Sequence, residues 1–131
     1  MAELEALDPA GGSIPGGKRR LLSLERAWTA ALGNTIKVFV VDLDRAMELS
    51  ACLARSQAGS INDCSAETDA VPKRLLLDLA SLGLPLDNYE GMAIGPRLAD
   101  GRRSLLLVND NNFSVHQIGT QFILLALALE D

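Results

Sequence analysis

The stretch TIKVFVVDL, residues 35–43, decides the fold class of this chain. Ile36 and Val38 fall on one face of an extended segment, and Lys37 and Phe39 fall on the other. β-Branched residues dominate the stretch, which favours a strand over a helix. Because both faces are largely apolar, we expect a strand in a sheet that is covered on both sides.

Short strands with similar patterns are predicted on either side of this one. They cover residues 21–26, 73–79, 89–94, 104–109 and 120–129, and turn-rich stretches such as GPRLADG and DNNFSVHQ divide the last three. Evenly spaced short strands are typical of all-β sandwiches, barrels and propellers. The last stretch, TQFILLALAL, is the exception, because its many Leu and Ala residues favour a helix by propensity alone.

Three segments are predicted to lie outside the sheets. Residues 1–19 are rich in Gly, Pro and Ala and are expected to form a flexible loop or linker ahead of a domain over 20–131. A short helix is predicted over 44–55, with Asp44 as its N-cap, and a polar loop over 56–69. Cys52 and Cys64 suit either a small disulfide loop or two unrelated buried thiols.

Length and charge exclude several classes of protein. The chain has 131 residues, 48% of them apolar, which suits one globular domain. Its net charge of −5 and its lack of a broad basic tract argue against nucleic acid as a partner. The N-terminus is acidic where a signal peptide would be basic. The longest apolar run, 122–129, is far shorter than the roughly 20 residues that a membrane-spanning helix needs.

Acids and amides stand at the ends of two predicted strands. Glu90 begins an otherwise apolar strand, and Asp110, Asn111 and Asn112 follow another. Carboxylate and amide oxygens are the ligands that calcium prefers. Two other interpretations stay open: Asp110 to Asn112 also suit an ordinary turn, and Glu90 also suits an ion pair with Arg or Lys.

Among the other polar residues, Glu25 and Arg26 are adjacent, so only one of them can face a given site. Lys73 is part of a basic pair that suits either phosphate binding or a solvated surface. His116 is the sole histidine, and without a GxSxG sequence it does not indicate a triad hydrolase. The glycines near the N-terminus do not form a phosphate-binding P-loop.

Taken in order, several of these segments resemble the closing blades of the family described as esterase-like activity of phytase. The most specific part is EGMA…GP.L.DGRR.LLLV.D.NF over residues 90–113, followed by TQF at 120–122. The resemblance implies antiparallel four-stranded blades, so this chain would supply about two blades of a partial β-propeller, with a short helix or loop insertion. It also implies that TQFILLALAL is a strand.

The resemblance further implies hydrolysis of phosphomonoesters such as phytate, assisted by calcium, within a complete propeller. Carried over by motif, Glu90, Asp110 and Asn111 would be metal ligands, and Glu25, Arg26 and Lys73 catalytic or phosphate-holding residues. The alternative is a noncatalytic binding or structural module. The expected partners are a small phosphorylated substrate and either further blades or a second copy of the chain. The family suggests a periplasmic or secreted location, where a disulfide between Cys52 and Cys64 would be favoured.

Overall fold

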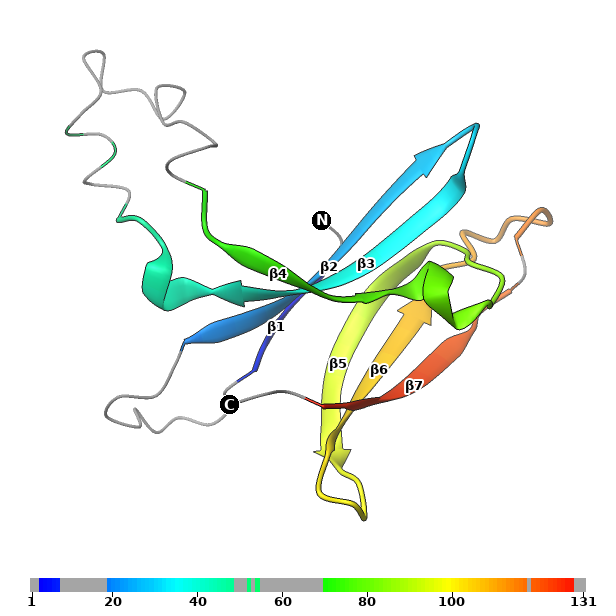
Figure 1. Cartoon of the computed structure of the whole chain (residues 1–131). Helices are drawn as coiled ribbons and strands as arrows, with labels where there is room; N and C mark the ends of the chain where they lie inside the picture. The colour runs from blue at the N-terminus through cyan, green and yellow to red at the C-terminus, as the bar shows by residue number, and fades with distance from the viewer. Residues whose placement is uncertain are drawn as a thin grey trace.

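Two antiparallel sheets make up the fold in the computed structural model, which describes residues 3–7, 19–48, 52, 54, 70–117 and 119–128 (Figure 1). The first sheet has the order β1-β2-β3-β4, with β1 (Glu3–Ala6), β2 (Arg20–Thr29), β3 (Gly33–Asp42) and β4 (Lys73–Asp78). The second has the order β5-β6-β7, with β5 (Tyr89–Arg97), β6 (Arg103–Asn109) and β7 (Phe122–Leu127). The all-β, antiparallel prediction is confirmed. The described strands form no closed barrel, and their arrangement is consistent with part of a propeller.

The core lies where the two sheets face one another. From the first sheet it takes the face of β2 and β3 that carries Leu24, Ile36 and Val38, all fully buried. From the second it takes Leu105 and Leu107 of β6, which are equally buried. The sequence predicted a strand covered on both faces. The face of β3 that carries Ile36 and Val38 is buried, whereas Lys37 and Phe39 on the other face are only partly buried.

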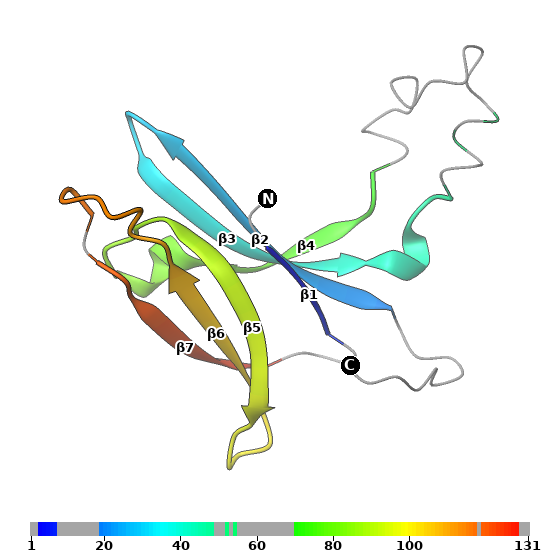
Figure 2. The same ribbon diagram turned by 180° about the vertical axis from the view of Figure 1, so that it is seen from behind.

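β1 corrects the predicted N-terminal loop. Residues Glu3–Ala6 pair with β2 in regular antiparallel register. Glu5 also accepts a hydrogen bond from the backbone N–H of Ile94 in β5, at 3.3 Å. Figure 2 shows β1 beside β5, where it links the two sheets. The open edge of β2 offers a row of hydrogen bonds that outweighs the weak strand preference of these residues. Residues 8–18 lie outside the described part of the chain.

The predicted helix over 44–55 is wrong in its first part. A short 3-10 helix, η1 (Leu43–Arg45), ends β3, and residues 46–48 have no regular structure. Asp42 caps η1 by accepting from the N–H of Asp44. The Asp44 carboxylate instead accepts from the backbone N–H of Arg19 and from its Nε, at 3.0 and 2.8 Å, so it is not available as a helix cap.

Further along the insertion, Cys52 and Ala54 are helical. Cys52 is buried and takes part in a disulfide. Cys64 and the predicted loop over 56–69 lie outside the described residues. No helix in the described ranges is long and apolar enough to cross a membrane.

The remaining strand predictions are confirmed with small changes at their ends. The predicted strand over 73–79 stops at Asp78, whose carboxylate accepts from the N–H of Ala80 and so starts the 3-10 helix η3 (Leu79–Leu82). Within the TQFILLALAL stretch, residues 122–127 form β7 despite their helix propensity, because pairing with β6 satisfies their backbone hydrogen bonds.

Candidate functional site

A polar cavity of about 570 Å³ lies at one end of the interface between the sheets. Three parts of the chain line it: the end of the β2–β3 hairpin, the segment that leads into β5, and the loop between β6 and β7. The lining residues are Arg26, Trp28, Asn34, Leu86, Asp87, Asn88, Glu90, Asn112, His116 and Gln117. This volume is within the ordinary range for small-molecule sites.

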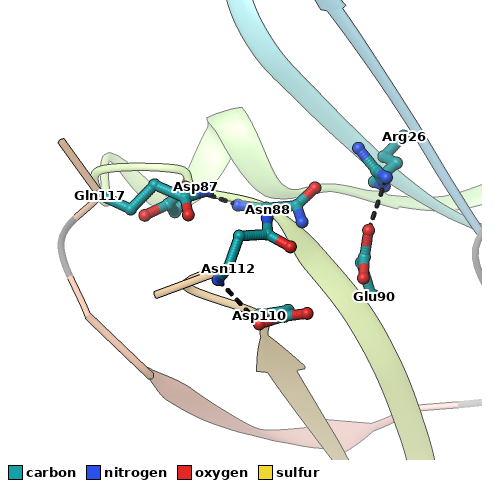
Figure 3. Close-up of polar contacts among 7 residues, drawn as sticks. All are labelled: Arg26, Asp87, Asn88, Glu90, Asp110, Asn112 and Gln117. Carbon is teal, nitrogen blue, oxygen red and sulfur yellow. Dashed lines mark hydrogen bonds and ion pairs between the residues drawn. The ribbon is translucent and has the colours of Figure 1, made fainter. Parts of the chain in front are cut away.

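Arg26 and Glu90 join the two sheets inside this cavity. Nη2 of Arg26 donates to Oε1 of Glu90 at 2.5 Å, and both side chains are about one-third exposed (37% and 36%). Figure 3 shows the two side chains pointing toward one another from β2 and β5. The ion-pair interpretation that the sequence left open for Glu90 is therefore the one observed.

A buried network fixes the wall opposite the hairpin. The Oδ1 atom of Asp87 accepts from the N–H of Asn88 at 2.8 Å and from Nε2 of Gln117 at 2.9 Å (Figure 3). Asp87 and Asn88 are only 5% and 7% exposed. Because these polar groups are buried and hydrogen-bonded, they form a rigid rather than an adaptable surface.

The loop between β6 and β7 is held by Asn109 at the end of β6. Its side-chain Nδ2 donates to the carbonyl oxygen of Gly119 at 2.8 Å, and its Oδ1 accepts from the N–H of Gln121. Asn109 is almost fully buried. It therefore fixes the base of the loop that brings Asn112 and His116 to the cavity.

Glu90 and Asp110 lie at the same end of the second sheet, as predicted. Tyr89 is opposite Asn109 in the register, and the N–H of Asp110 donates to the carbonyl oxygen of Asn88 at 2.9 Å. Their carboxylates nevertheless serve different purposes. Only Glu90 lines the cavity, whereas Oδ1 of Asp110 accepts from the N–H of Asn112 at 2.8 Å (Figure 3).

Asn111 makes the equivalent turn contact one residue later. Its Oδ1 accepts from the N–H of Phe113 at 3.2 Å, and it too is absent from the cavity lining. Asn112 and Phe113 both have positive φ, of 49° and 53°. These are the features of a local turn built by Asx side chains, the second interpretation that the sequence left open for this segment.

Glu25 and Lys73 form a separate ion pair on the other face of the first sheet. Nζ of Lys73 is 2.7 Å from both carboxylate oxygens of Glu25 and 4.5 Å from the centre of the Phe39 ring. The Lys73 ammonium lowers the pKa of the Glu25 carboxyl below its ordinary value. The structure thus brings Arg26 to Glu90, and Glu25 to Lys73, but it does not bring these two pairs together.

The cavity contains oxygen atoms of the kind that calcium binds, but only a few of them belong to carboxylates. Asp87 and Glu90 supply carboxylates, and the neighbouring side-chain amides, such as that of Asn112, supply further oxygens of the type that calcium binds. Within the described ranges, no three His, Cys, Asp or Glu side chains come close enough together to hold a metal ion. A site with two carboxylates should bind calcium weakly.

Most of the cavity could not be recognised from the sequence. Trp28, Asn34, Asp87 and Gln117 carry no motif, and they meet only because the hairpin end and two loops converge. The predicted strand ended at Arg26; extending it to Thr29, as in β2, would have placed Trp28 on the same face as Arg26.

Comparison with known protein families gives one match. The family model described as "Phytase-like: Esterase-like activity of phytase" matches residues 11–113, which is most of the chain and includes Arg26 and Glu90. No curated protein and no solved structure matches the chain.

Proposed function

The chain belongs to the phytase-like family described as esterase-like activity of phytase, and from this premise we propose that its cavity binds the phosphate group of a small phosphate ester for hydrolysis. The observation that carries the proposal is the Arg26–Glu90 pair inside the cavity. A guanidinium has five N–H donors in a planar fork that matches phosphate oxygens. The Glu90 contact engages Nη2 and limits the rotation of the group.

The reaction adds water across the ester bond. The oxygen of water attacks phosphorus, the bond between phosphorus and the ester oxygen breaks, and the alcohol leaves with a proton while inorganic phosphate is released. Arg26 would hold the phosphoryl oxygens as charge redistributes over them. Glu90, which holds Arg26 and would also bind calcium, is not free to act as the base, so the attacking water would lose its proton to solvent and the departing alkoxide would take one from solvent.

Charge within the cavity gives calcium a role in this proposal. Asp87 and Glu90 bring two negative charges against the single guanidinium of Arg26, so a phosphate dianion would enter an already acidic site. Glu90, Asp87 and Asn112 would hold the ion. When bound, calcium would offset the repulsion and polarise the phosphoryl oxygens.

Phosphate release from a panel of phosphomonoesters tests the proposal. The full chain is assayed with added calcium and with a chelator, beside Arg26→Gln, Glu90→Gln and the control Arg74→Gln, which removes an equal charge from the exposed start of β4. We expect Arg26→Gln to lower the rate at least tenfold and Arg74→Gln to leave it unchanged. If all three variants release phosphate at the rate of the parent chain, the cavity takes no part in the reaction.

A noncatalytic binding module is the second candidate. It is favoured by the lack of a three-acid cluster in the described residues and by the ion-paired state of both Arg26 and Glu25. This candidate predicts that phosphate esters bind to the cavity in an Arg26-dependent way but are recovered intact.

A further inference from the structure

Trp28 is the unusual residue of the cavity. It is the only tryptophan in the chain, it lines the cavity, and its exposed fraction is 66%. Large aromatic side chains usually contribute most when buried, so this exposure leaves a large apolar ring surface uncovered. The Trp28 ring is therefore available to a ligand that enters the cavity.

The position of Trp28 follows from the alternation along β2. Leu22 and Leu24 are fully buried on the core face, and Arg26 and Trp28 continue that face beyond the core to the cavity. Residues two apart in a strand are separated by roughly 6.5 Å. An indole and a guanidinium thus stand side by side on one rigid strand.

The opposite wall of the cavity offers hydrogen-bonding groups. Asn88, Asn112 and Gln117 line it, and each side-chain amide has both donors and an acceptor. The side-chain N–H of Gln117 already donates to Asp87. A further amide, that of Asn34, lies on β3 opposite Trp28 in the β2–β3 register. Paired donors and acceptors of this kind match the edges of nucleobases, whereas the faces of bases stack on aromatic side chains.

We infer that the cavity takes a nucleoside monophosphate, whose base stacks on Trp28 while its phosphate binds to Arg26. The inference rests on the proposed function for the phosphate half and extends it to the organic half of the ester. A mononucleotide does not require the broad basic surface that a nucleic acid polymer would need. The acidic net charge of the chain is therefore compatible with this ligand.

Fluorescence of the single tryptophan tests the inference directly. The full chain is excited at the red edge of indole absorption and titrated with adenosine monophosphate, adenosine, ribose 5-phosphate and inorganic phosphate. Calorimetry measures the affinity of each of these ligands for Trp28→Leu, for Trp28→Phe and for the control Phe113→Leu. The control changes a fully exposed aromatic residue outside the cavity lining.

We expect the monophosphate to bind most tightly and to quench the fluorescence. Trp28→Leu should weaken its binding by about fivefold to a hundredfold, the range found for a base stacked on an aromatic side chain. Trp28→Phe should restore part of the affinity, and Phe113→Leu should change nothing. Inorganic phosphate should bind equally to the parent chain and to Trp28→Leu.

Two contrary results are distinguishable. If ribose 5-phosphate binds as tightly as the monophosphate and Trp28→Leu has no effect, the inference is overturned while the proposed phosphate site stands. If no phosphorylated ligand binds and Arg26→Gln changes nothing, the proposed function fails, and the inference fails with it.

Discussion

Nη2 of Arg26 and Oε1 of Glu90 lie 2.5 Å apart although the two residues are separated by 64 positions in the chain. The contact connects the end of β2 in the first sheet to the start of β5 in the second. It is also the point at which the apolar interface between the sheets gives way to the polar cavity.

Removing this ion pair should change stability little. Both side chains are about one-third exposed, and exposed ion pairs contribute roughly 0–1 kcal/mol. We expect the free energies of unfolding measured in urea to differ from that of the parent chain by no more than about 1 kcal/mol. This holds for Arg26→Gln, for Glu90→Gln and for the double variant. A loss above twice that amount would mean that the pair holds the sheets together rather than serving the cavity.

Stability at acidic pH should depend on Glu25. Because Lys73 lowers the pKa of Glu25 in the folded chain below the ordinary value of 4.5, the ionised carboxylate stabilises the fold above that pH. This contribution is lost as pH falls through the lower, folded pKa. Urea unfolding between pH 6 and pH 3 should therefore show a weaker pH dependence for Glu25→Gln, and likewise for Lys73→Met. If the stability of both variants depends on pH as steeply as that of the parent chain, the ion pair between Glu25 and Lys73 does not stabilise the fold.

Gly91 should be intolerant of a side chain because of its neighbour on β6. A Cβ atom at Gly91 would lie 2.5 Å from Cγ1 of Val108, closer than real Cβ contacts. We expect Gly91→Ala to destabilise the fold by about 1–3 kcal/mol, as overpacking does. Adding Val108→Ala should recover much of that loss in chemical unfolding. Additive effects of the two substitutions would argue against the register given for β5 and β6.

Asn109 should contribute more to stability than the other asparagines near the cavity. Asn109→Ala would leave the carbonyl oxygen of Gly119 and the N–H of Gln121 without their side-chain partner. Both hydrogen bonds are part-buried, and a bond of this kind contributes about 0.5–1.5 kcal/mol to stability. The control Asn111→Ala removes only a turn contact and should cost less. Thermal unfolding that ranks these two variants in the opposite order would contradict this account of the loop.

Terbium, a luminescent substitute for calcium, can locate the proposed cation site. Energy transfer from Trp28 should sensitise terbium emission, because Trp28 lines the same cavity as Glu90. We expect Glu90→Gln to weaken binding at least tenfold, Asp110→Asn to leave it unchanged, and added calcium to compete. Loss of the signal in Asp110→Asn alone would instead favour the ligand set expected from the sequence.

Local patterns predicted the strands well and failed where distant parts of the chain compete. The alternation and β-branched residues in 35–43 predicted β3 itself, since both are properties of the segment alone, but the expected cover on both faces is complete only where Ile36 and Val38 lie. β1 escaped prediction because its four residues form a strand only by adding to the edge of β2. The helix predicted after Asp44 lost its cap to Arg19, a residue 25 positions away.

The candidate site was predictable only in part, for the same reason. The ends of two neighbouring strands must meet, so Glu90 and Asp110 could be placed at one end of the sheet. Which carboxylate turns into the cavity depends on local turn bonds that Asp110 makes and Glu90 does not. The opposite faces of Glu25 and Arg26 were predictable, but the partner of each was not, because both ion pairs are long-range.

The contact between Glu5 of β1 and Ile94 of β5 spans 89 positions and has consequences for the folding pathway. The β2–β3 and β5–β6 hairpins close over short turns, whereas closing so long a loop costs chain entropy before any contact compensates for it. Docking of one sheet onto the other should therefore be the slow step. During synthesis, β1 would leave the ribosome well before β5, and its final packing would have to wait for β5.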